Sequence, residues 1–233
     1  MFLFDTQKAF QIQNDNQMNN YVYIIAGLPD FTPDWRQGEK SLDEYLGQMR
    51  ELLSEKDNST LDFIESGFDK EKIGLEFYKE ALASGNRFIR DFFLFDFNVR
   101  NAKVRYLNQA LSRDPQKDIL SLVDPEDEEK GIEHEEPEFK EAARLQAILE
   151  GKDILARERG IDDLYWEKID ELTLFNYLDF EKILGITVKM MIIRRWLILD
   201  EEINITPPEG SGTSGAMGPG VDGWEEKDAE LYM

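Results

Sequence analysis

One glycine pattern in the sequence matches a motif that binds dinucleotides. The pattern Gly-x-Gly-x-x-Gly begins at Gly210, and its glycines would let a pyrophosphate approach the first turn of a helix. That chemistry also needs a strand before the pattern and a helix after it. Pro207 and Pro208 stand where the strand would end, and a Gly-Pro-Gly run from Gly218 stands where the helix would continue. We therefore interpret residues 203–233 as a flexible Gly/Pro-rich and acidic tail.

His134 is the single histidine of the chain, and it lies inside an acidic run from Asp124 to Glu136. Neighbouring carboxylates stabilise the protonated imidazole, which would give this run a weak response to pH. A zinc site would need further histidine or cysteine ligands, and the chain has no second histidine and no cysteine. We therefore expect His134 to be a solvated loop residue and not a metal ligand.

The acidic run also offers oxygen atoms to a divalent cation such as calcium. If an EF-hand loop started at Glu126, Gly131 would take the sixth position, as that loop requires. Lys130 and Pro137 would then take the fifth and twelfth positions, where oxygen ligands are needed. The ligand pattern is broken, and we expect an exposed loop because the carboxylates repel one another.

No motif in the sequence places a nucleophile next to a base. There is no Gly-x-Ser-x-Gly elbow and no Gly-Lys-Ser/Thr phosphate loop. A pair of carboxylates for glycoside cleavage cannot be singled out among 49 acidic residues. We predict no catalytic, cofactor-binding or metal-ligating residue, and hence no enzyme. A hydrolase that uses the carboxylates of residues 124–136 is the enzymatic alternative left open.

Composition and charge narrow the classes of function further. The 233 residues are 41% hydrophobic and 12% aromatic, which is enough to form a core. The formal net charge of -22 repels phosphate backbones, so we expect no nucleic acid partner. The lack of cysteine fits a reducing compartment, and we expect a cytoplasmic location. Lys189, Arg194 and Arg195 interrupt the most apolar stretch, Ile183 to Leu199, so we expect no direct membrane insertion.

Hydrophobic spacing predicts a chain of helices after one short strand. Residues 21–26 are β-branched and aromatic and end in a turn at residues 27–30, which is typical of a strand. Ser41 and Glu44 have the spacing of a capping box, and Gly160 is expected to break a helix before a new cap at Asp162 or Asp163. The expected helices cover residues 41–53, 59–66, 69–83, 87–112, 139–151, 162–175 and 179–201, and residues 153–159 are expected to continue or restart the helix of residues 139–151 before Gly160.

One of these helices is expected to be central, and a second one to pack against it. The helix at residues 87–112 carries phenylalanines on a face too wide for a surface helix. The helix at residues 179–201 is the most hydrophobic, and we expect it to pack against the first.

Arg194, Arg195 and Trp196 form an unusual group inside that most hydrophobic helix. Two arginines there must extend to water, pair with acids such as Asp200 or Glu201, or face a partner. Arginine and tryptophan are enriched at protein interfaces. These three residues are therefore candidates for partner binding.

Short motifs occur along the chain in an order that matches a protein family. They are Asn20 to Asp30, Asn98 to Asn101, Glu158 to Ile161, Trp166, Phe175 to Tyr177 and Arg194 to Leu197. From about Met18 to Glu202 the sequence resembles a bacterial family of formally unknown function that is encoded in V-type (A-type) ATPase operons. That family is similar to the C/d subunit of the V-type ATPase central stalk.

The resemblance implies a non-catalytic subunit that couples the central rotor stalk to the membrane ring during ion transport. It implies partners among the other V-type ATPase subunits, and a location peripheral to the inner membrane through the complex. Arg100 and Trp166 lie in the resembling motifs and join Arg194, Arg195 and Trp196 as expected partner-binding residues. The alternative is a soluble helical adaptor or regulatory interaction protein.

The fold expected from the sequence is mainly α. We predict a helical bundle with one short N-terminal β-strand and a disordered C-terminal tail. Residues 1–17 form a disordered lead, residues 18–202 the helical domain similar to the C/d stalk protein, and residues 203–233 the tail.

Overall fold

The structure confirms the mainly α class but not the N-terminal strand. The structure is a computed structural model that describes residues 20–36, 40–123 and 139–205, and within these ranges every regular element is a helix. Residues 20–27 are helical, so the strand prediction for residues 21–26 is wrong. Tyr21, Ile24, Ile25 and Leu28 pack into one hydrophobic cluster, and their spacing is that of one helix face. This burial outweighs the β-propensity of the individual residues.

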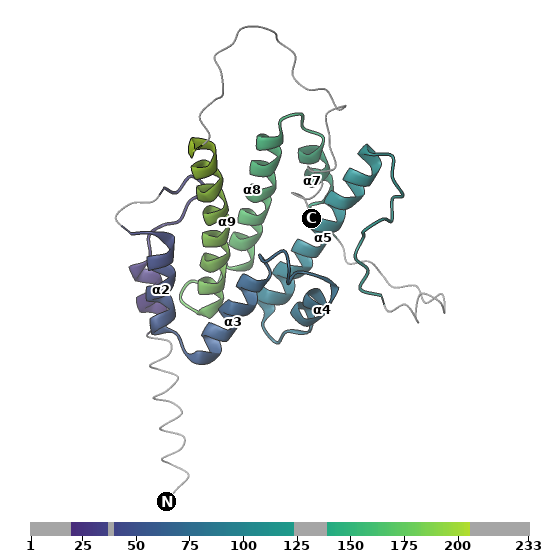
Figure 1. Ribbon diagram of the computed structural model, residues 1–233. Helices are drawn as coiled ribbons and strands as arrows, with labels where there is room; N and C mark the ends of the chain where they lie inside the picture. Colours follow the sequence, from purple (N-terminus) through teal and green to yellow (C-terminus); the bar gives the residue numbers. More distant parts are fainter. Residues whose placement is uncertain (1–19, 37–39, 124–138, 206–233) are drawn as a thin grey trace, which may run out of the picture.

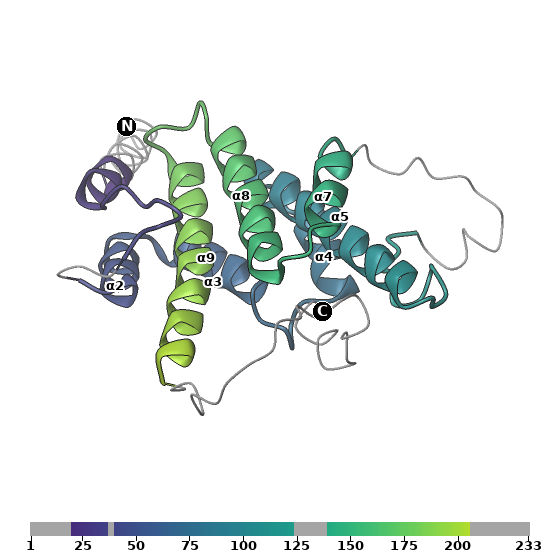
Figure 2. The same cartoon turned by 90° about the horizontal axis from the view of Figure 1, so that it is seen from above.

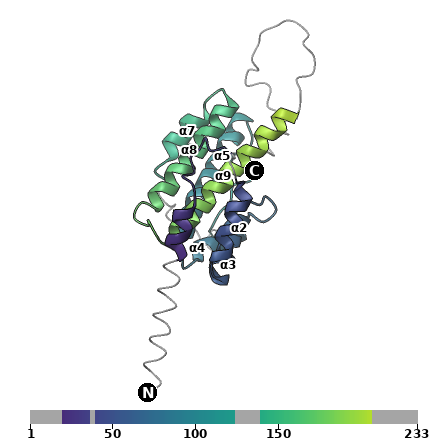
Figure 3. The same cartoon turned by 90° about the vertical axis from the view of Figure 1, so that its left-hand side faces the viewer.

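Seven further helices within the described ranges have bounds that can be given by residue. They are α2 (Leu42–Leu52), α3 (Glu55–Ser66), α4 (Leu75–Ala83), α5 (Arg87–Ala110), α7 (Ala142–Leu149), α8 (Ile154–Leu172) and α9 (Phe180–Ile205). Figures 1 and 2 show α9, α8 and α7 in a row, with α5 crossing the row obliquely. Figure 3 shows α9 between α2 and α3 on one side and α7 and α8 on the other.

Side-chain caps begin several helices where the sequence supplies them. The capping box of α2 is confirmed, because Ser41 Oγ accepts from the Glu44 amide and the Glu44 carboxylate accepts from the Ser41 amide at 2.6 Å. A second capping box, Ser54 with Asp57, begins α3. That cap starts α3 at Glu55, four residues before the start expected from apolar spacing alone.

The helix α8 runs without a break through Gly160, so the predicted stop and the predicted cap at Asp162 or Asp163 are wrong. Its cap is Asp153, whose carboxylate accepts hydrogen bonds from two backbone amides. A Cβ atom at Gly160 would lie 3.0 Å from Ile148 Cγ2. The glycine therefore permits α7 to approach α8 closely and does not end the helix.

Two hydrophobic clusters form the core on either side of α5. The larger one joins α2, α3, α4, α9, the first half of α5 and the end of α8. The smaller one joins α5, α7 and α8 through Phe95, Val99, Leu145, Leu149, Ile161 and Leu164. Neighbouring positions of α5 contribute to both, because Phe95 belongs to the smaller cluster and Phe97 to the larger one. The predicted central role of this helix is confirmed.

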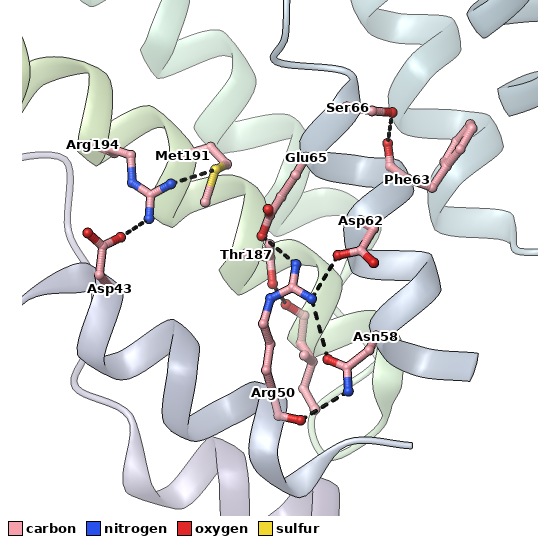
Figure 4. A network of polar contacts seen from close by, with 11 residues as sticks. Asp43, Arg50, Asn58, Asp62, Phe63, Glu65, Ser66, Thr187, Met191 and Arg194 are labelled. Carbon is pink, nitrogen blue, oxygen red and sulfur yellow. Dashed lines mark hydrogen bonds and ion pairs between the residues drawn. The ribbon is translucent and has the colours of Figure 1, made fainter. Parts of the chain in front are cut away.

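The helix α9 packs mainly against α3 and α8, with a smaller contact to α5. The expected contact between α9 and α5 therefore exists but is not the principal one. Polar contacts fasten α2 to its neighbours (Figure 4). Arg50 of α2 pairs with Glu65 and Asp62 of α3, each at 2.8 Å, and Asp43 of α2 pairs with Arg194 of α9.

Some predictions fall partly or wholly outside the described residues. These are the lead at residues 1–17, the acidic run with His134, and the tail from residue 206 onward. The helix α9 continues to Ile205, three residues into the range expected as tail. Among the described helices, none combines the length and apolar character needed to cross a membrane.

Candidate functional site

A cavity of about 990 Å³ lies between the end of α3, the middle of α5, the first half of α8 and the second half of α9. Figure 4 shows three of its lining residues, Glu65, Met191 and Arg194. The charged residues of its lining are Glu65, Asp69, Lys70, Asp96, Arg100, Lys103, Glu158, Asp162, Arg194 and Arg195. Such a concentration of charge beside a hydrophobic core makes this cavity the candidate functional site.

The first polar centre of the cavity is Asp96, a buried carboxylate on α5. Arg100 Nε donates to its Oδ2 atom at 2.9 Å, one helical turn away, and Tyr78 of α4 donates to the same oxygen at 2.5 Å. Tyr165 of α8 donates to Oδ1 at 2.7 Å. Burial raises the pKa of Tyr78 and Tyr165 above the usual value for tyrosine, and the negative charge of Asp96 adds to the effect. Both hydroxyls therefore stay protonated as donors.

The second polar centre is Asp162, on the next turn of α8 toward its start. Arg195 of α9 donates to its Oδ2 atom at 2.6 Å, and the Trp196 indole N–H donates to the same oxygen. Burial raises the pKa of Asp162, while Arg195 and Trp196 act in the opposite direction. The two polar centres therefore join α4, α5, α8 and α9 around one cavity.

Two further charged groups extend this network. Burial lowers the pKa of Lys103 on α5, although the charge of Glu158 partly offsets the effect. Glu158 approaches Arg195 at 3.7 Å, and no described residue donates a hydrogen bond to its buried Oε1 atom. The guanidinium of Arg159 lies 3.8 Å from the centre of the Trp196 ring, which is a cation–π contact.

The cavity brings together four of the five residues predicted to bind a partner. Arg100, Arg194, Arg195 and Trp196 all line it. Trp196 is a buried member of the larger hydrophobic cluster, and the three arginines pair with Asp96, Asp43 and Asp162 within the chain. Trp166 is not among the lining residues, and its ring instead lies 4.5 Å from the Lys189 ammonium. Their role in partner binding stays a prediction.

Sequence reasoning did not identify the two carboxylates that organise the site. Asp96 is one of 49 acidic residues, but it is an isolated acid between Phe95 and Phe97 and lies four residues before Arg100. Those two features were the available signal, because an acid on an apolar helix face must have a partner. Asp162 carried no such signal, since its partner Arg195 is 33 residues away.

The charged groups of this arrangement pair with one another within the chain. Both organising carboxylates accept hydrogen bonds from several donors at once, so they balance cations and hold helices in place. No group of three or more potential metal ligands occurs within the described ranges. The acidic run at residues 124–136 lies outside them, so its proposed use in hydrolysis stays untested.

A second surface stands out at the turn between α8 and α9. Leu174, Phe175, Tyr177 and Leu178 expose 54%, 85%, 66% and 53% of their surface. The turn is nevertheless held in place, because Asn176 donates to the Asp179 carboxylate at 2.6 Å and to the Thr173 carbonyl at 3.1 Å. An ordered turn that exposes large apolar side chains is typical of a protein contact surface.

Comparison with known proteins places the sequence in a family without assigning it an activity. Neither the curated proteins nor the solved structures yield a significant match to this chain. One protein family matches residues 70–204, which include α4, α5, α7, α8 and most of α9. The matched region is more than half of the chain and contains both organising carboxylates as well as the apolar turn. The chain belongs to the family described as protein of unknown function, DUF2764.

Proposed function

We propose that this chain is a non-catalytic peripheral subunit of a V-type ATPase that couples the central rotor stalk to the membrane ring. Its partners in this proposal are the stalk and ring subunits, and it sits at the membrane through them. Short motifs occur along the chain in the same order as in a family encoded beside such ATPases, and this resemblance supports the assignment. The mainly helical fold is compatible with it.

The observation that carries the proposal is the exposed apolar turn between α8 and α9. Phe175 exposes 85% of its surface, although moving an aromatic ring out of water lowers the free energy. The turn also coincides with the Phe175 to Tyr177 motif on which the resemblance partly rests. A contact surface for another protein of the complex explains both the exposure of these side chains and the hydrogen bonds that fix the turn.

The proposal predicts that the protein purifies with a membrane complex. Membranes would be solubilised gently, the tagged full chain recovered, and the accompanying proteins identified by mass spectrometry. We expect ATPase head and ring subunits in a fixed ratio. Phe175→Ser with Tyr177→Ser should abolish their recovery, because both rings leave the contact surface.

Leu155→Ser is the matched control, because Leu155 exposes 58% of its surface near the other end of α8. This variant should retain the complex. Recovery of the wild-type chain alone from the soluble fraction would contradict the ATPase assignment and favour a helical adaptor. Equal recovery with both variants would show that the turn is not the contact surface.

A further inference from the structure

The charged cavity is balanced in charge, although the chain as a whole is strongly acidic. Its lining contains five basic and five acidic residues, against 27 basic and 49 acidic residues in the sequence. Four of the five acids, Glu65, Asp69, Asp96 and Asp162, accept hydrogen bonds within the chain. The cavity is therefore a local exception to the negative field of the protein, and anionic groups are repelled less there than elsewhere.

The edge of the same cavity is apolar and exposed. Phe68, Ile154, Ile198 and Leu199 line it and expose 40%, 54%, 50% and 37% of their surface. An occupant that places acidic side chains beside the basic ones and large apolar side chains on the edge is compatible with this lining.

The sequence contains such a segment at residues 224–233, Trp-Glu-Glu-Lys-Asp-Ala-Glu-Leu-Tyr-Met. Its four acidic residues and one lysine give it a charge of 1 − 4 = −3. Large apolar side chains flank the charges, with Trp224 before them and Leu231 and Tyr232 after them. The segment therefore offers apolar side chains for the cavity edge and acidic side chains for the basic residues of the lining.

The connection between α9 and this segment is long enough to reach the cavity. Leu199 of the cavity edge lies six residues before the end of α9 at Ile205, a rise of about 9 Å along the helix. Residues 206–223 contain six glycines and three prolines. A Gly-rich random coil of this many residues has an end-to-end distance of roughly 23 Å. Tethering at this distance gives the segment an effective concentration on the order of millimolar.

We propose that residues 224–233 bind in the cavity between α5, α8 and α9 of the same chain. The acidic side chains of the segment face Arg100, Lys103 and Arg195, and Trp224 and Tyr232 cover the apolar edge. An acidic partner that uses these arginines must first displace the segment. The chain thus regulates access to its own binding cavity, and this inference does not depend on the ATPase assignment.

Engineered cysteines can test this binding in the full chain, because the natural sequence contains no cysteine. Ile198→Cys combined with Leu231→Cys places one thiol at the cavity edge and one in the segment. Asp43→Cys with Leu231→Cys is the control, since Asp43 pairs with Arg194 at the same end of α9 but does not line the cavity. Intramolecular disulfide formation under mild oxidation is followed by mass spectrometry and non-reducing electrophoresis.

We expect the 198–231 pair to form its disulfide at least ten-fold faster than the 43–231 pair. Glu225→Gln with Glu226→Gln should reduce this preference several-fold, and so should high salt, because the attraction is electrostatic. These changes alter no residue of the described helices. Equal rates for the two pairs would overturn the proposal, and disulfide-linked dimers in place of the intramolecular product would assign the cavity to a second copy.

Discussion

Two regions of α5 show how differently the same helix is used. Phe93 is fully buried and contacts the rings of Phe63, Phe77 and Phe92. Asp96 lies three residues later and is almost as deeply buried, but it is held by three hydrogen-bond donors. Burial of an aromatic ring stabilises the fold directly. In a buried ion pair, the attraction between the charges offsets only part of the cost of removing them from water. The aromatic region therefore accounts for stability. The charged region contributes less to stability, so it is the better candidate for a functional role.

The largest loss of stability is expected when the aromatic region of α5 is opened. Phe93→Ala should lower the free energy of unfolding by about 3–5 kcal/mol, because it leaves a cavity among three other rings. Denaturant titration followed by circular dichroism measures the change. Phe175→Ala on the exposed turn is the control and should change stability by less than about 0.5 kcal/mol. A loss below about 1 kcal/mol for Phe93→Ala would contradict the assigned core.

Removing the buried negative charge should have the next largest effect. Asp96→Asn removes the buried carboxylate charge that pairs with Arg100 at 2.9 Å, and we expect a loss of about 3 kcal/mol. The matched control is Asp91→Asn, because the Asp91 pair with Arg87 has the same spacing on the same helix but is exposed. That control should cost less than about 1 kcal/mol. Similar losses for both variants would show that burial does not distinguish the two pairs.

A methyl group added to the aromatic region tests its packing from the opposite direction. In Gly67→Ala the new Cβ atom would lie 2.5 Å from Phe93 Cε1 and 2.9 Å from Phe77 Cζ. The backbone of Gly67 is right-handed helical, so alanine adds no backbone strain and the clash is isolated. We expect a loss of about 1–3 kcal/mol in thermal or denaturant unfolding.

Gly47→Ala in α2 serves as the control for this substitution, since the added methyl group has no neighbour within 4 Å apart from the adjoining residues and backbone of its own helix. Alanine should stabilise that helix by up to about 1 kcal/mol. If both substitutions stabilised the protein, the close approach at Gly67 would be refuted.

The smallest expected effect concerns the charge of Lys103 and its dependence on pH. Burial lowers the pKa of this ammonium below its unfolded value of 10.5, so the folded state favours the neutral form. The stability that this preference contributes is complete above pH 10.5 and is lost as the pH falls through the folded pKa. Lys103→Met should therefore gain stability over the wild type at neutral pH, by less than about 1 kcal/mol. The gain should shrink as the pH approaches 10.5, and a gain that grew with pH would contradict the assignment.

Much of the fold could be predicted because helices are encoded locally. The capping box at Ser41 and the wide apolar face of α5 each lie within a few residues, and both are confirmed. The helix at residues 20–27 was also encoded locally, but its β-branched residues obscured the spacing of Tyr21, Ile24, Ile25 and Leu28. Gly160 was misinterpreted because its role depends on Ile148 of a neighbouring helix, which local spacing does not reveal.

The candidate site was less predictable because its contacts are distant in sequence. The Arg194 to Leu197 motif indicated where charged residues would gather, and three of those residues do line the cavity. The two arginines pair with Asp43 of α2 and Asp162 of α8, up to 151 residues away. Only the packing of α8 against α9 could show that Asp162, one acid among many, accepts hydrogen bonds from Arg195 and Trp196.

The packing of α3 and α2 on α9 has a consequence for the order of folding during synthesis. The third helix is complete at Ser66, but α9 begins at Phe180, so more than 100 residues must be translated between them. At about 5–20 residues per second this takes roughly 6–23 seconds. During that interval the apolar faces of the early helices lack the surface that covers them in the native protein. A nascent chain that stalls before α9 should consequently be a substrate for chaperones, whereas one released after α9 should not.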